Sequence, residues 1–135
     1  MKKFINIIFI FISIIIFNTI IVNAHQFDNK WEELKFEFIK EKGGEWHFTL
    51  DEAEQIGIEL GINWNNSSFD IDQFRVGLEV ELEHGLIDPN TNVTDDDPYL
   101  TGKIALAHLN ELSDYYFRLL DMEIKAEKEK EEFEF

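Results

Sequence analysis

The sequence predicts an all-α protein, a small bundle of four to five short helices that follows a signal peptide or an anchor helix. Three observations predict this fold class. Apolar residues recur at helical spacing through most of the chain after residue 25. A helix-capping residue precedes four of these segments. The chain has 135 residues, and removing a leader leaves about 110, enough for one modest core.

The first 24 residues have the three parts of a secretory signal peptide. Lys2 and Lys3 form a basic start, residues 4–22 are almost wholly Ile, Phe and Val, and residues 22–24 resemble a small-residue cleavage site. The apolar run also approaches the ~20 residues that span a bilayer, so an uncleaved anchor remains the alternative. In both cases the basic flank stays cytoplasmic and residues 25–135 cross the membrane. After cleavage they are secreted or lie in a secretory lumen; without cleavage a single-pass anchor holds them outside.

The segment after the leader, residues 25–47, is aromatic and amphipathic. Its apolar residues follow helical spacing at Phe27, Trp31, Leu34, Phe38 and Ile39. A hairpin is the competing interpretation, because apolar residues alternate in residues 34–38 and 46–50 on either side of a Gly-Gly pair. We favour the helix because its pattern starts earlier and runs further.

The predicted helical domain, residues 48–124, opens with two well-marked helices. Thr49 and Glu52 form a capping box for a helix over residues 51–60, and Gly61 can close it. Asp70 caps the second helix, which ends at Gly85. The apolar stripe of this second helix comprises Ile71, Phe74, Leu78 and Leu82.

Two further helices complete the predicted bundle. Asp97 caps and Pro98 begins the third, and residues 99–112 are apolar on nearly every side, which predicts the central helix. Ser113 is expected to cap the fourth. The predicted stripe of that helix comprises Tyr115, Leu119, Met122 and Ala126. Residues 125–135 form a charged tail that we expect to fray.

Composition restricts the possible partners. The chain has 12 basic and 28 acidic residues; without Lys2 and Lys3, the remainder carries ten against 28, a formal charge of −18. Nucleic acid and anionic membrane surfaces would be repelled, so a membrane is expected only through the N-terminal segment. There is no cysteine, hence no disulfide, thiolate metal site or thiol nucleophile. An unidentified protein or small ligand is the expected partner.

Residues 48–123 also carry a set of short motifs that can be compared with known domains. These are Phe74-Arg75, Glu81-Leu82-Glu83-His84-Gly85, Thr91-Asn92-Val93-Thr94, Asp96-Asp97-Pro98, the run from Thr101-Gly102-Lys103 to Asn110-Glu111, Asp114-Tyr115-Tyr116, Arg118-Leu119 and Met122-Glu123. Together they resemble an uncharacterised domain-of-unknown-function family of bacteria and phages. The resemblance implies a small helical domain and no assigned activity; the leader and residues 27–47 depart from it.

Glu81, His84, His108 and Glu111 are candidate ligands for a divalent metal. Each Glu/His pair is spaced by three residues, which places its members on adjacent turns of one helix. Carboxylate and imidazole pairs at this spacing hold iron or manganese in bundle cores, and such a set also suits zinc. Alternatively, His84 only complements a helix C-terminus and His108 is a core histidine held by one hydrogen bond.

Two loops carry weaker signals. Asn65, Asn66 and Asn92 each begin an Asn-x-Ser/Thr triplet and are glycan acceptors if the source is eukaryotic. Residues 88–99 resemble the start of a calcium loop, but Val93 and Tyr99 stand where that loop requires Gly and Glu. The overall prediction is a non-enzymatic binding or interaction module; the alternative is a metal-dependent helical protein or enzyme.

Overall fold

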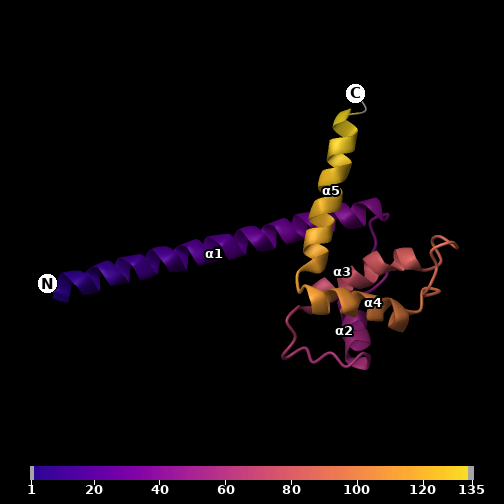
Figure 1. Ribbon diagram of the computed structural model, residues 1–135, viewed down its shortest axis with the longest axis horizontal. Helices are drawn as coiled ribbons and strands as arrows, with labels where there is room; N and C mark the ends of the chain where they lie inside the picture. Colours follow the sequence, from indigo (N-terminus) through magenta and orange to yellow (C-terminus); the bar gives the residue numbers. More distant parts are fainter. Residues whose placement is uncertain (1, 134–135) are drawn as a thin grey trace. The chain divides into compact units, whose positions relative to one another are not determined.

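The computed structural model describes residues 2–133, and their side chains from residue 12 onward. Its elements are α1 (Lys2–Glu41), α2 (Leu50–Glu59), α3 (Ile71–Glu81), the short 3-10 helix η1 (Leu82–His84), α4 (Pro98–Glu111) and α5 (Tyr115–Phe133) (Figure 1). No strand occurs within residues 2–133, so the all-α prediction is confirmed. The chain separates into two units, Met1–Glu33 and Leu34–Phe135, each described by itself below.

The first unit consists of the N-terminal part of α1. Apolar side chains between Ile12 and Val22 are exposed in it, and Thr19 donates its hydroxyl to the carbonyl of Ile15 at 2.9 Å. The side chains of residues 1–11, where the predicted leader begins, lie outside the described residues. Among the residues that were described, no helix is long and apolar enough to cross a membrane.

The segment of residues 25–47 is helical as far as Glu41, as favoured, and is not a hairpin. The second unit begins inside α1, whose Leu34, Phe38 and Ile39 are buried in the core. After Glu41 the chain turns at Gly43 and Gly44, where φ is +101° and +89°, a backbone region that glycine enters without a steric penalty. This turn ends the helical path of α1 and leads the chain toward α2.

Polar contacts attach the segment before α2 to α3. Lys35 forms an ion pair with Asp72 on α3, and Arg75 pairs with the other oxygen of Asp72 at 2.9 Å. The guanidinium of Arg75 also lies 3.8 Å from the ring centre of Trp46. One turn further on, buried Glu79 accepts a hydrogen bond from the backbone N–H of Phe48 at 2.7 Å. These contacts make residues 34–48 part of the folded domain.

The predicted helix starts are confirmed for α2, α3 and α4. Thr49 and Glu52 form the complete capping box, while Asp70 and Asp97 accept hydrogen bonds from the backbone N–H groups of Gln73 and Leu100. Each side chain thereby satisfies a donor that the first turn of a helix leaves unpaired. Gly61, with φ of +85°, follows the end of α2 as expected.

The central helix is α3, so the prediction for α4 was wrong. Eight of the eleven residues of α3 are buried, and the helix contacts α2, α4 and α5. In α4 only Thr101, Gly102, Ala105 and Leu109 are buried, whereas Tyr99, Leu100 and Leu112 are exposed. Small residues set the packing distance, since a Cβ on Gly77 would lie 3.0 Å from Cβ of Ala105. Helix α4 therefore packs against α3 mainly through small residues, and most of its larger apolar side chains lie outside the contact.

The apolar stripe predicted for the fourth helix was also wrong. Its buried residues are Tyr116, Leu120 and Ile124, whereas Met122 is exposed. The helix itself begins at Tyr115, so Asp114, and not the predicted cap Ser113, directly precedes it. The helix also continues through most of the charged tail to Phe133, where we expected fraying.

Candidate functional site

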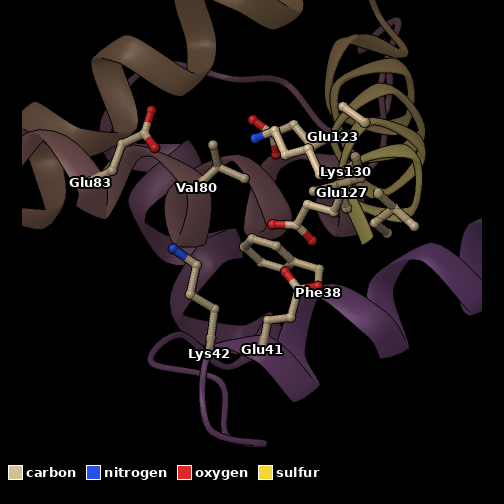
Figure 2. Close-up of a pocket in the computed structure, with 11 residues that line it drawn as sticks. Phe38, Glu41, Lys42, Val80, Glu83, Glu123, Glu127 and Lys130 are labelled. Carbon is tan, nitrogen blue, oxygen red and sulfur yellow. The ribbon is translucent and has the colours of Figure 1, made fainter. Parts of the chain in front are cut away.

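A groove with a volume of about 360 Å³ lies in the second unit, between the last turn of α1, α3 and α5 (Figure 2). Its apolar wall consists of Phe38, Val80, Leu120 and Ile124, with Ala126 nearby. Its carboxylates are those of Glu41, Glu83, Glu123 and Glu127. Lys42 and Lys130 are the cations at this groove, and the ammonium of Lys42 lies 5.5 Å from the ring centre of Phe38.

Crowding of the carboxylates changes their acidity. Partial burial raises the pKa of Glu41, and a hydrogen bond with Glu127 and the negative charge of Glu127 raise it further. Burial is also the largest cause of the raised pKa of Glu123, followed by the charge of Glu83. The groove therefore combines an apolar wall with more negative charge than its own lysines neutralise.

A second polar cluster is built around Glu81 at the end of α3. The side chain of Glu81 is only 3% exposed, and Tyr116 of α5 donates its hydroxyl to Oε1 at 2.7 Å. Nε2 of His84 lies 3.4 Å from Oε2, and Nε2 of His108 lies 3.6 Å from Oε1. Oε2 itself has no hydrogen-bond partner. A buried carboxylate thus has an imidazole nitrogen near each of its oxygens.

The surroundings hold this cluster in place. The ring of His108 stacks on Tyr115 with centroids 4.4 Å apart, and Tyr116 packs edge-on against both rings. Burial, followed by the charge of Glu81, raises the pKa of Tyr116, so its hydroxyl keeps its proton and remains a donor. His84 and His108 are 40% and 34% exposed, which leaves the cluster open to solvent on its imidazole side.

Three of the four predicted ligands come together, and the fourth does not join them. Contacts connect Glu81, His84 and His108, while Glu111 is exposed at the end of α4. His108 is half-buried, whereas the alternative was a core histidine held by one hydrogen bond. In the described part of the chain, no group of three or more His, Cys, Asp or Glu residues is placed so that it could hold a metal ion.

The acidic loop before α4 uses its side chains on its own backbone. Asp96 accepts a hydrogen bond from the N–H of Leu86 at 2.8 Å, and Asp97 caps α4. Asn92 exchanges hydrogen bonds with Asp95, and the hydroxyl of buried Thr94 donates to the carbonyl of His84. These contacts agree with a structural loop that also orders the backbone beside His84.

Comparison with known families concerns mainly the part of the chain that holds the second cluster. A family model described as "Protein of unknown function (DUF5661)" matches residues 53–125. The chain belongs to the DUF5661 family. No curated protein and no solved structure shows a significant match. In this DUF5661 chain, Glu81, His84, His108 and Tyr116 lie inside the matched residues, whereas the last turn of α1, which contributes to the groove, precedes them.

Proposed function

We propose that this DUF5661 chain is exported and that its helical domain acts beyond the membrane as a non-enzymatic binding module. The observation that carries the proposal is the order of the first 24 residues: two lysines, an apolar run over residues 4–22, and a small-residue site before His25. Cleavage would release a secreted domain, and retention of the run would leave a single-pass anchor.

The acidic groove is the place where we propose that a ligand binds. Its apolar wall and four carboxylates suit a ligand that carries a positive charge on an apolar body. Such a ligand would reduce the repulsion that contributes to the raised pKa values of Glu41 and Glu123. The formal charge of −16 for the whole chain favours the approach of cations for the same reason.

If the source is eukaryotic, we propose Asn65 and Asn66 as the better glycan acceptors. Both are exposed in the loop between α2 and α3. Asn92 is half-buried, its amide donates to Asp95 at 2.6 Å, and the Thr94 hydroxyl of its triplet is buried. Expression in a eukaryotic secretory host followed by glycosidase treatment tests the choice: Asn65→Gln with Asn66→Gln should abolish the mass change, and Asn92→Gln should not.

Export is tested by fusing the full chain to an enzyme that becomes active only outside the cytoplasm. We expect reporter activity from the fusion and its loss when Ile14 and Ile15 are both changed to Asp, because charge interrupts the apolar run. The same change at exposed Ile58 is the matched control and should preserve activity. Activity that survives the Ile14→Asp, Ile15→Asp change would contradict export through this segment.

Binding in the groove is tested with phenethylammonium, a cation on an apolar ring, by NMR titration of the full chain in detergent. We expect shift changes at Phe38, Val80 and Leu120, and their loss in a Glu83→Gln, Glu123→Gln variant. Changing exposed Glu129 and Glu131 to Gln removes the same amount of charge outside the groove. This control variant should show the same ligand-induced chemical-shift changes as the unchanged chain. Equal weakening by both pairs of changes would show attraction by net charge and no groove site.

A further inference from the structure

We infer that the groove binds the lysine side chain of a partner peptide, and that Lys42 occupies this place until the peptide displaces it. The inference rests on the binding function proposed for the groove and specifies its ligand. It starts from the ring of Phe38, which lines the groove, and the ammonium of Lys42, which lies 5.5 Å from the centre of that ring (Figure 2). At this distance the electron-rich face of an aromatic ring attracts a cation.

The chain's own lysine shows which chemistry the groove accommodates. Lys42 lines the same cavity as Phe38 and Val80, so an ammonium on an aliphatic stem already fits beside the apolar wall. Burial raises the pKa of Glu123, and the positive charge of Lys42 opposes that rise. An ammonium at this place is therefore favoured by an aromatic ring and by a carboxylate at the same time.

The contacts of Lys42 are weak enough for another cation to replace it. The residue is exposed, and it directly follows the end of α1 and precedes the turn at Gly43. Among the side chains that the structure describes, its ammonium has no ion-pair or hydrogen-bond partner, whereas Lys40 pairs with Glu37 at 3.2 Å. Because a lysine is a strongly hydrated charge on a flexible stem, Lys42 can turn into water.

The charge of the groove favours a cation from outside. Four carboxylates and two ammonium groups line it, which is a formal excess of two negative charges. When Lys42 turns into water, a peptide lysine replaces its charge and adds apolar contacts with the wall. The ligand therefore binds the fraction of chains in which Lys42 has left the ring, so Lys42 weakens the apparent affinity without abolishing binding.

The test titrates the full chain in detergent, at about 0.1 M salt, with Nα-acetyl-lysine N-methylamide and follows the binding by NMR. We expect chemical-shift changes at Phe38 and Val80. Lys42→Met keeps an unbranched apolar stem and removes the charge, so its Kd should be roughly 2–5-fold lower, the factor that corresponds to an exposed contact between a cation and a ring. In the unchanged chain, the side-chain signal of Lys42 should move toward that of exposed Lys128 as the ligand replaces it.

The matched control variant is Lys128→Met, which removes the same charge from the surface of α5 outside the groove. Its Kd should equal that of the unchanged chain, because salt screens charges at the exposed surface. The matched control ligand is Nα-acetyl-norleucine N-methylamide, which lacks only the ammonium. It should cause no shift changes at Phe38 or Val80 at the same concentration.

The outcomes separate this inference from the binding function on which it rests. If Lys42→Met binds no more tightly than the unchanged chain, or if Lys128→Met tightens binding equally, displacement of Lys42 is wrong and the groove remains a cation site. Equal binding of the norleucine compound would overturn the assignment of a lysine side chain. If neither phenethylammonium nor the lysine compound shifts Phe38 in the unchanged chain or in Lys42→Met, the binding function of the groove itself is wrong.

Discussion

At the scale of single residues, the buried carboxylate of Glu81 accepts the hydroxyl of Tyr116 and has the imidazoles of His84 and His108 beside its two oxygens. The i,i+3 spacing correctly drew attention to Glu81, His84 and His108, because it places side chains on adjacent turns. The same spacing also selected Glu111, which is exposed. Which of two adjacent tyrosines reaches Glu81 depends on which face α5 turns toward α3, because neighbouring residues of a helix project about 100° apart. Sequence alone therefore could not identify Tyr116.

Replacing Tyr116 by Phe tests the contact with Glu81. The change removes the hydroxyl that donates to this buried carboxylate while keeping the ring, so we expect the free energy of unfolding to fall by about 1–3 kcal/mol. Urea denaturation at pH 7 measures the loss. Tyr115→Phe is the control and should change stability by less than about 0.5 kcal/mol. An equal effect of the two substitutions would show that the Glu81 contact contributes nothing specific.

Gly77→Ala tests the close packing of α3. A Cβ at this position would lie 2.5 Å from a ring carbon of Tyr116, so that ring must move. We expect the free energy of unfolding to fall by about 1–3 kcal/mol, although alanine has a higher helix propensity than glycine. Thermal unfolding measures it, with Glu59→Ala at the exposed end of α2 as a control for the added alanine. A Gly77→Ala chain at least as stable as the unchanged chain would refute the packing argument.

At the scale of elements, helix starts were predictable and buried faces were not. Thr49, Asp70 and Asp97 act locally, through hydrogen bonds to backbone groups two or three residues away, so their roles can be seen in the sequence. The face that a helix buries depends on its neighbours. Because α4 packs through Gly102 and Ala105, its larger apolar residues are left outside, which apolar periodicity could not indicate.

The capping box gives a local prediction. Thr49→Ala removes the oxygen that accepts from the N–H of Glu52, and we expect a loss of about 1 kcal/mol in the free energy of unfolding. Thr49→Ser keeps the hydroxyl and should restore most of it. If the serine variant were as unstable as the alanine variant, the cap would not be the cause.

The approach of α5 to the last turn of α1 predicts a dependence of stability on pH. A carboxyl whose pKa is raised by folding binds its proton more tightly in the folded state. The stabilisation from Glu41 and Glu123 is therefore present below their ordinary pKa of about 4.3 and is lost as the pH rises through the raised values. Neutral pH is thus the condition in which these two carboxyls destabilise the fold.

Glu127→Gln tests this sign, because it removes the charge beside Glu41 and leaves an amide that can still donate to it. We expect a higher Tm than that of the unchanged chain at pH 7 and little difference near pH 4. Glu129→Gln on the exposed surface of the same helix controls for net charge. If the two variants have the same Tm at pH 7, the crowding argument is wrong.

At the scale of the whole molecule, length and the absence of cysteine were consistent with one packed helical domain, which the structure describes as the unit Leu34–Phe135. The matched family residues, 53–125, cover most of that unit but not its first helical turns. Lys35, Phe38 and Ile39 are buried there, so the folded domain extends before the family match. The groove was not predicted, because abundant acidic residues conceal which carboxylates the fold brings together.

The most direct test of export is the location and the first residue of the chain in the cells that make it. Fractionation followed by mass spectrometry of the N-terminal peptide measures both. We predict a chain outside the cytoplasm that begins at His25, or a membrane-bound chain that keeps residues 1–24 and exposes its domain to external protease. A cytoplasmic chain that retains Met1 and resists external protease only while the cells are intact would contradict the account.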